Sequence, residues 1–163
     1  MPAGRRGFTL VELIVATAIF SVVITMVIGA FSMAIKAQKK VIALQNIQEN
    51  AKFILEFLAK EVRMGTISTA NGIRTNLVFI RSDETSITYV FTDGKITRNG
   101  VAMNADEVEI IGRFYINGVG PDNLQPKLTV VMQLKALGSE FEEETIINVE
   151  STLSQRVIDE SDL

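Results

Sequence analysis

The run of residues from 8 to 35 contains 28 residues, and Glu12 is its only charged side chain. About 20 consecutive apolar residues in a helix cross the ~30 Å hydrocarbon core of a bilayer, so this run is long enough to span a membrane. A charged group inside such a segment costs roughly 2.5–3.5 kcal/mol on insertion scales, which makes it a candidate functional residue. The sequence therefore predicts a membrane helix with one carboxylate near its start, and that carboxylate needs a partner.

Basic residues flank the run on both sides, so their distribution does not set its orientation: Arg5 and Arg6 precede it, and Lys36, Lys39 and Lys40 follow it. Three familiar interpretations remain open. A secretory signal peptide would use Ala16-Thr17-Ala18 as its cleavage site, a twin-arginine export signal would use Arg5-Arg6, and an uncleaved signal anchor would use the whole run. Hydrophobicity continues well beyond Ala18, and the anchor explains every feature except Glu12.

Composition excludes several kinds of chemistry. The 163 residues include no Cys and no His, so a disulfide framework, a thiolate metal site and a His general base are all excluded. We therefore expect no enzyme activity, no catalytic residues, no metal and no cofactor. The formal net charge of −3 also differs from the basic balance of a general nucleic-acid binder, and we expect no nucleic-acid partner.

The residues Gly7-Phe8-Thr9-Leu10-Val11-Glu12, behind a short basic leader and ahead of a long apolar run, resemble the type III signal of type IV prepilins and type II secretion pseudopilins. The resemblance implies that a prepilin peptidase cleaves between Gly7 and Phe8 and methylates the new amine of Phe8. It also implies that Glu12, then the fifth residue, meets the N-terminal amine of a neighbouring subunit during filament assembly.

We expect three segments: a leader peptide at 1–7, a transmembrane and filament-core helix at 8–35, and a body at 36–163. Beyond residue 35, apolar residues recur at three- and four-residue steps up to Val62, which predicts an amphipathic continuation of the helix to Met64. Gly29 is either a soft point of this helix or a place of close helix–helix approach. Phe53 and Phe57 are expected to pack under a sheet.

The rest of the chain predicts strands. Six β-favouring runs follow the helix: 77–80, 87–91, 95–98, 108–116, 128–137 and 144–153. Asp93-Gly94 between the second and third predicts a tight hairpin. A loop is expected from Asn117 to Pro126 and a frayed acidic tail at 158–162. The acidic run at 140–144 is expected to be a solvated hairpin end, with a calcium site as the alternative. The expected fold is α+β and pilin-like, with the C-terminal half of the long helix packed on an antiparallel sheet.

This layout is similar to the J-type minor pseudopilin of type II secretion and to its W-type (PilW-like) counterpart among minor pilins. The similarity implies a minor structural subunit of a pilus or pseudopilus, with prepilin peptidase, other pilins and an inner-membrane assembly platform as partners. It implies a single-pass protein of the bacterial inner membrane with an extracytoplasmic C-terminal domain, which later enters the filament.

A monomeric membrane-anchored module that binds a soluble partner or DNA is the alternative. Six dispersed basic residues are the candidates for a DNA-binding patch: Arg74, Arg81, Lys95, Arg98, Arg113 and Lys127. The two hypotheses differ at Glu12, because a filament subunit requires this carboxylate whereas an anchor tolerates its loss.

Overall fold

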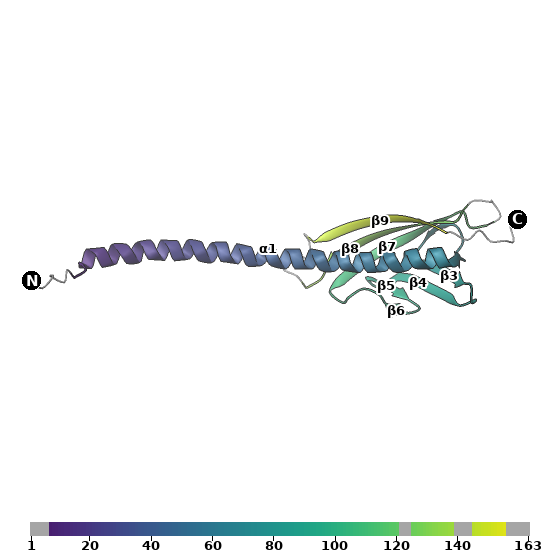
Figure 1. Ribbon diagram of the computed structural model, residues 1–163, viewed down its shortest axis with the longest axis horizontal. Helices are drawn as coiled ribbons and strands as arrows, with labels where there is room; N and C mark the ends of the chain where they lie inside the picture. The colour runs from purple at the N-terminus through teal and green to yellow at the C-terminus, as the bar shows by residue number, and fades with distance from the viewer. Residues whose placement is uncertain (1–6, 121–124, 139–144, 156–163) are drawn as a thin grey trace, which may run out of the picture. The chain divides into compact units, whose positions relative to one another are not determined.

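The computed structural model describes residues 7–120, 125–138 and 145–155. In these residues one helix precedes nine strands (Figure 1). Their bounds are α1 Leu10–Met64, β1 Gly65–Ile67, β2 Gly72–Arg74, β3 Asn76–Arg81, β4 Ser86–Thr92, β5 Lys95–Arg98, β6 Val101–Ala102, β7 Val108–Asn117, β8 Lys127–Ala136 and β9 Ile146–Ser154. The chain divides into two compact units, Met1–Lys39 and Lys40–Leu163, and α1 contributes residues to both.

In the first unit, every described side chain of α1 is exposed, as expected of a segment whose natural surround is lipid. By length and composition, α1 is the one described helix able to cross a membrane. Its hydroxyl side chains bond back to carbonyl oxygens of the preceding turn: Thr17 to Leu13 at 3.0 Å, Ser21 to Thr17 at 2.8 Å, Thr25 to Ser21 at 2.8 Å and Ser32 to Ile28 at 2.9 Å. These four polar groups are therefore satisfied without any partner outside the helix.

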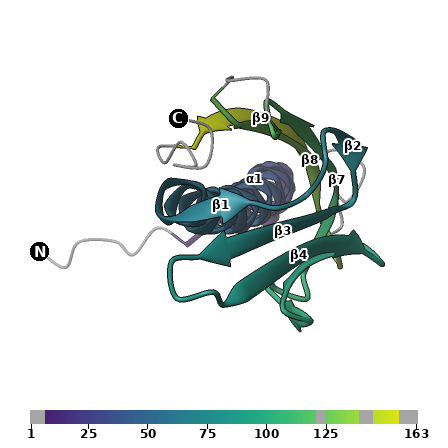
Figure 2. The ribbon, with the colours of Figure 1, turned by 90° about the vertical axis from the view of Figure 1, so that its right-hand side faces the viewer.

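In the second unit, one stripe of α1 forms the centre of the core. Its fully or nearly fully buried apolar residues recur at three- and four-residue steps: Ile47, Ala51, Ile54, Leu58 and Val62. Figure 2 shows this part of the helix between β8 and β9 on one side and β1 and β3 on the other. The spacing explains the arrangement, because a helix repeats every 3.6 residues and presents such a stripe along one face.

The described strands form two antiparallel sheets, one in the order β1-β3-β4-β5-β6 and the other in the order β2-β7-β8-β9. The α+β class and the long N-terminal helix are confirmed, and the six longer strands lie where alternation predicts them. The division into two sheets, and the short strands β1, β2 and β6, were not expected. The hairpin between β4 and β5 is confirmed: Asp93 and Gly94 have positive φ angles of 49° and 71°, as a tight hairpin turn requires.

The two sheets approach each other closely at Gly112 of β7. A Cβ there would lie 2.6 Å from Cζ of Phe91, a residue of β4 in the other sheet, and 2.8 Å from the carbonyl oxygen of Val131. The Phe91 ring packs against the tilted ring of Phe114, two residues further along β7, with a centroid distance of 4.7 Å. Gly112 is therefore the place where an aromatic side chain of one sheet lies against the backbone of the other.

The expectation that Phe53 and Phe57 pack under a sheet is wrong, because Phe53 is exposed and Phe57, which is half-buried, is not part of the core. The two rings contact each other at a centroid distance of 4.7 Å, but Phe53 is 44% exposed and lies outside the core. Both residues fall off the stripe that Ile54 and Leu58 define, so helix periodicity turns them away from the buried face. The predicted acidic hairpin end at 140–144 and the acidic tail at 158–162 lie outside the described residues.

Candidate functional site at the head of the helix

Thr9 and Glu12 form a reciprocal cap at the start of α1. The backbone N–H of Thr9 donates to Oε2 of Glu12 at 2.8 Å, and the Thr9 hydroxyl donates to the same oxygen at 2.9 Å. In return, the backbone N–H of Glu12 donates to the Thr9 hydroxyl oxygen at 3.3 Å. This is a capping box, in which a Thr before the first helical residue and a Glu three positions later satisfy each other's backbone donors.

The cap gives Glu12 a local partner in the isolated chain. A carboxylate in the first turn also lies at the positive end of the helix dipole, which favours its charged form. Both hydrogen bonds that the Glu12 side chain accepts go to Oε2, and Oε1 accepts none from the described residues. One oxygen of Glu12 is therefore left open to a donor from outside the chain.

The sequence analysis missed this cap, although the signal was present. Thr-x-x-Glu directly ahead of an apolar run is the sequence pattern of a capping box. We expected the partner of Glu12 in another subunit, whereas a local partner, Thr9, lies three positions earlier in the chain.

The other predicted site residues, Gly7, Phe8 and Gly29, are all exposed. Gly7 and Phe8 precede the helix, no atom lies within 4 Å of a Cβ built on Gly7, and Phe8 is 84% exposed. Gly29 lies within α1, and a Cβ there also meets no atom within 4 Å. The peptide bond between Gly7 and Phe8 is thus sterically open. Phe8 lies four residues before Glu12 in the chain. Both interpretations of Gly29 stay predictions.

The comparison with protein families matches this segment. The family model of the prokaryotic N-terminal methylation motif covers residues 2–28, which include Gly7, Phe8 and Glu12. The chain therefore carries a prepilin-type N-terminus, consistent with the type IV pilin and pseudopilin family. Neither a curated protein nor a solved structure matches the chain.

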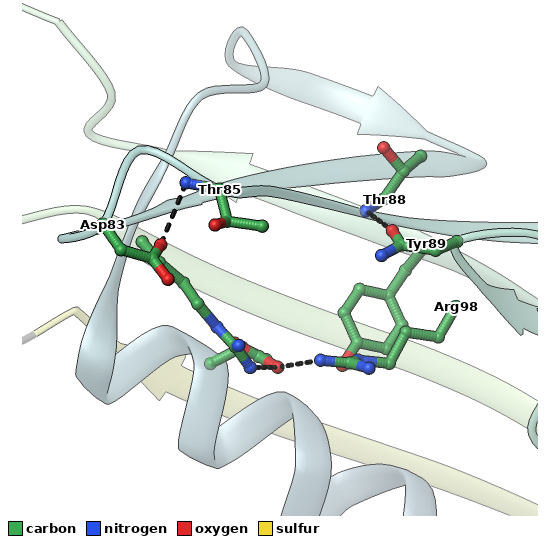
Figure 3. A network of polar contacts seen from close by, with 8 residues as sticks. Asp83, Thr85, Thr88, Tyr89 and Arg98 are labelled. Carbon is green, nitrogen blue, oxygen red and sulfur yellow. Dashed lines mark hydrogen bonds and ion pairs between the residues drawn. The ribbon is translucent and has the colours of Figure 1, made fainter.

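A second polar cluster lies at the other end of α1. Glu61 is in the last turns of the helix, and its side chain is 3% exposed. Its Oε1 accepts from Nη2 of Arg81 at 2.7 Å and from Nη2 of Arg98 at 2.8 Å, and its Oε2 accepts from Nε of Arg81 at 3.1 Å. Nε of Arg98 also donates to the Tyr89 hydroxyl at 3.2 Å. Figure 3 shows the side chains of Tyr89 and Arg98 from close by. We call these four residues the Glu61 cluster.

The Glu61 cluster joins the helix to the five-stranded sheet, because Arg81 ends β3, Tyr89 lies on β4 and Arg98 ends β5. Burial raises the pKa of Glu61, but hydrogen bonds from the two guanidinium groups and their charges outweigh burial and hold this pKa below its ordinary value. Burial, and after it the charge of Glu61, raises the pKa of Tyr89. The cluster thus holds a charged carboxylate in the core, and its polar groups form hydrogen bonds with one another.

Of the six basic residues of the possible DNA patch, three form ion pairs, two share a surface hollow, and Lys127 lines a different hollow. Arg81 and Arg98 are engaged by Glu61, and Lys95 forms an ion pair with Asp106. Arg74 and Arg113 line one small surface hollow of the body. No group of three or more His, Cys, Asp or Glu side chains within the described residues is placed to hold a metal ion.

Proposed function

We propose that this chain is a minor structural subunit of a type IV pilus or a type II secretion pseudopilus. In this proposal it is inserted in the bacterial inner membrane with its body outside the cytoplasm, cleaved after Gly7 by prepilin peptidase and methylated on Phe8. It then joins other pilins through residues 8–35, with the help of an inner-membrane assembly platform. Its role is structural, without enzyme activity or a cofactor.

The observation that carries the proposal is the state of Glu12. The hydroxyl groups of the same segment are satisfied by their own helix, whereas Glu12 is a charged group with one oxygen open. A cationic amine from the Phe8 of an adjacent subunit supplies the missing donor and neutralises two charges in a low-dielectric surround. The match to the methylation motif supports the same reading, because the motif belongs to chains whose new amine is processed.

The body supports a minor rather than a major subunit. Two antiparallel sheets around the helix give a strand-rich body, which fits the similarity to the J-type and W-type minor subunits. The alternative of a membrane-anchored binding module has one feature in its favour. Arg74 and Arg113 line a common hollow and have no ion-pair partner among the described residues, so an anionic ligand would find two donors there.

The test is the variant Glu12→Ala, produced together with the other pilins and the assembly machinery. We expect normal cleavage and membrane insertion but depletion from sheared filaments or from crosslinked complexes with other pilins. Removal of one partner of a buried pair costs about 3–5 kcal/mol, whereas an unassembled anchor is relieved of a charge. Incorporation at the wild-type level would favour the anchored module.

A matched variant separates the two roles of Glu12. Thr9→Val removes the capping hydroxyl and keeps the carboxylate, so it weakens the cap alone. We expect its incorporation to stay closer to the wild-type level than that of Glu12→Ala. Equal depletion of the two variants would mean that the cap, and not a contact between subunits, is what assembly requires.

A further inference from the structure

The four-stranded sheet ends at β9 in a long edge with which no other described strand pairs. Among the described strands at sheet edges, β1 and β2 have three residues each and β6 has two, whereas β9 has nine. Proteins usually protect an edge strand by keeping it short or by placing charges on it, because its free N–H and C=O groups are a template for another strand. β9 is long and has one charged residue, Glu150.

The register shows which backbone groups of β9 have no partner strand among the described residues. The Ala136 N–H donates to the Thr145 carbonyl, and the Gln155 N–H donates to the Pro126 carbonyl. Antiparallel ladders alternate, so the odd-numbered residues between them bond to β8 and the even-numbered residues direct their N–H and C=O groups to the open side. The residues with outward-directed backbone groups are Ile146, Asn148, Glu150, Thr152 and Ser154.

An apolar groove runs beside this edge, between β9 and the part of α1 in the same unit. Its volume is about 470 Å³, and its lining is mainly Ala51, Leu55 and Ala59 of the helix and Ile147, Val149 and Leu153 of the strand. Gln48, Lys52, Glu56 and Ser151 complete it. The helix residues recur at four-residue steps, and the strand residues at two-residue steps, so both elements present a continuous face to the groove. Figures 1 and 2 show β9, in yellow, alongside α1.

We propose that β9 binds an extended segment of a partner protein as an added antiparallel strand whose alternate apolar side chains fill this groove. The free edge supplies backbone hydrogen bonds, and the groove supplies pockets for every second side chain, which is how strand addition obtains affinity and specificity. A partner helix fits the groove less well, because it satisfies its own backbone groups and leaves those of β9 unpaired. This interface is separate from assembly through residues 8–35.

Charge argues against a second copy of the same strand as the occupant. Glu150 lies at the centre of β9, so full antiparallel pairing of two copies places one Glu150 opposite the other. Like charges directly opposite each other destabilise a sheet. A partner strand with a basic residue at that position is favoured instead, with apolar residues opposite Ile147, Val149, Ser151 and Leu153.

The test uses the full chain in detergent and a fluorescent peptide, Lys-Val-Thr-Val-Lys-Val-Thr-Val-Lys, as the probe. We expect saturable binding, measured by fluorescence anisotropy. In an antiparallel pair the Lys and Thr amides of the peptide point to β9 and the Val amides point away. N-methylation of the Lys and Thr amides should abolish binding, and N-methylation of the Val amides should preserve it.

Two variants with a matched control locate the site. Glu150→Pro removes an outward N–H without breaking the ladder to β8, and Glu150→Thr removes the same carboxylate but keeps the N–H. We expect binding to Glu150→Pro to be weaker than binding to Glu150→Thr by roughly ten-fold, the effect of one lost hydrogen bond with an unpaired carbonyl. Ala59→Phe fills the groove from the helix side and should also weaken binding. Thermal unfolding of each variant checks that the body is folded.

Four results would overturn the proposal. The first is no saturable binding, and the second is equal binding of the two methylated peptides. The third is a wild-type dimer, seen by sedimentation, that Glu150→Pro dissociates, because the occupant is then a second copy. The fourth is binding only by a chain that ends at Gln155, because residues 156–163 then occupy the groove.

Discussion

Glu12 has two possible partners, and they are available at different times. Before assembly, the cap with Thr9 satisfies one carboxylate oxygen within the chain itself. In the filament that we propose, the amine of Phe8 from another subunit would be a stronger partner, since it carries a full positive charge. The local cap thus supplies hydrogen-bond donors to the carboxylate in an unassembled subunit while its other oxygen stays open.

Processing is a prediction at the same scale. Gly7 has open space around its Cβ position in the chain itself, so replacing it does not disturb the fold. A peptidase cleft that admits backbone without a side chain should reject a branched residue. We expect Gly7→Val to leave the precursor intact, whereas the wild-type protein begins at N-methylated Phe8. Mass spectrometry of both proteins checks this, and a mature chain that begins after Ala18 would establish a signal peptide instead.

Some elements of the fold can be predicted from the sequence, and others cannot. The hairpin at Asp93-Gly94 and the helix stripe at Ile54 and Leu58 are predictable, because turn chemistry and period are local properties. The short strands are not, since two or three residues have no measurable alternation and exist only because a partner strand pairs with them. Glu61 is similarly hidden: it looks like a surface charge, and its partners Arg81 and Arg98 lie 20 and 37 residues away.

The Glu61 cluster gives a prediction for the junction of helix and sheet. Glu61→Gln removes the charge that two guanidinium groups share. We expect a loss of about 2–3 kcal/mol in the free energy of unfolding, less than the ~3–5 kcal/mol of a fully buried pair, because Arg81 and Arg98 are 37% and 29% exposed. Urea unfolding of the full chain in detergent, followed by tyrosine fluorescence, measures it. A loss below a few tenths of a kcal/mol would show that the cluster does not hold the junction.

The same cluster predicts a response to acid. The pKa of Glu61 is lower in the folded protein than its ordinary value of 4.5, so the charged carboxylate stabilises the fold above pH 4.5. This contribution is lost progressively as the pH falls from 4.5 through the lower folded pKa. Asp83 and Asp106 also have lowered pKa values, so the wild-type curve contains their contributions too. The difference between wild type and Glu61→Gln isolates Glu61, and it should shrink as the pH falls below 4.5.

At the scale of the whole molecule, membrane insertion and folding belong to different segments. Every buried apolar residue among the described positions lies at Ile47 or later, so the core is contained in the second unit. The sequence predicted the class of this unit but not its two sheets. Alternation shows which face of a strand is buried. It does not show on which side of the helix the strand packs, and so which of the two sheets it joins. Contacts between residues distant in sequence, such as that of the Phe91 ring with Gly112, determine this packing.

A fragment that begins near Lys36 should therefore fold without the membrane segment. Its core is complete, and Ile67 and Gln155, which are distant in sequence, are joined by a hydrogen bond of 2.9 Å from the Ile67 N–H to the Gln155 side chain. We expect a soluble monomer that unfolds cooperatively, with a free energy of unfolding of about 5–15 kcal/mol. Reductant should leave its urea midpoint unchanged, since the chain has no Cys. Chelator should also leave it unchanged, since no group of three or more His, Cys, Asp or Glu side chains among the described residues could hold a metal ion. Aggregation of the fragment in every buffer, or unfolding by chelator alone, would show that the body depends on the membrane helix or on a metal ion.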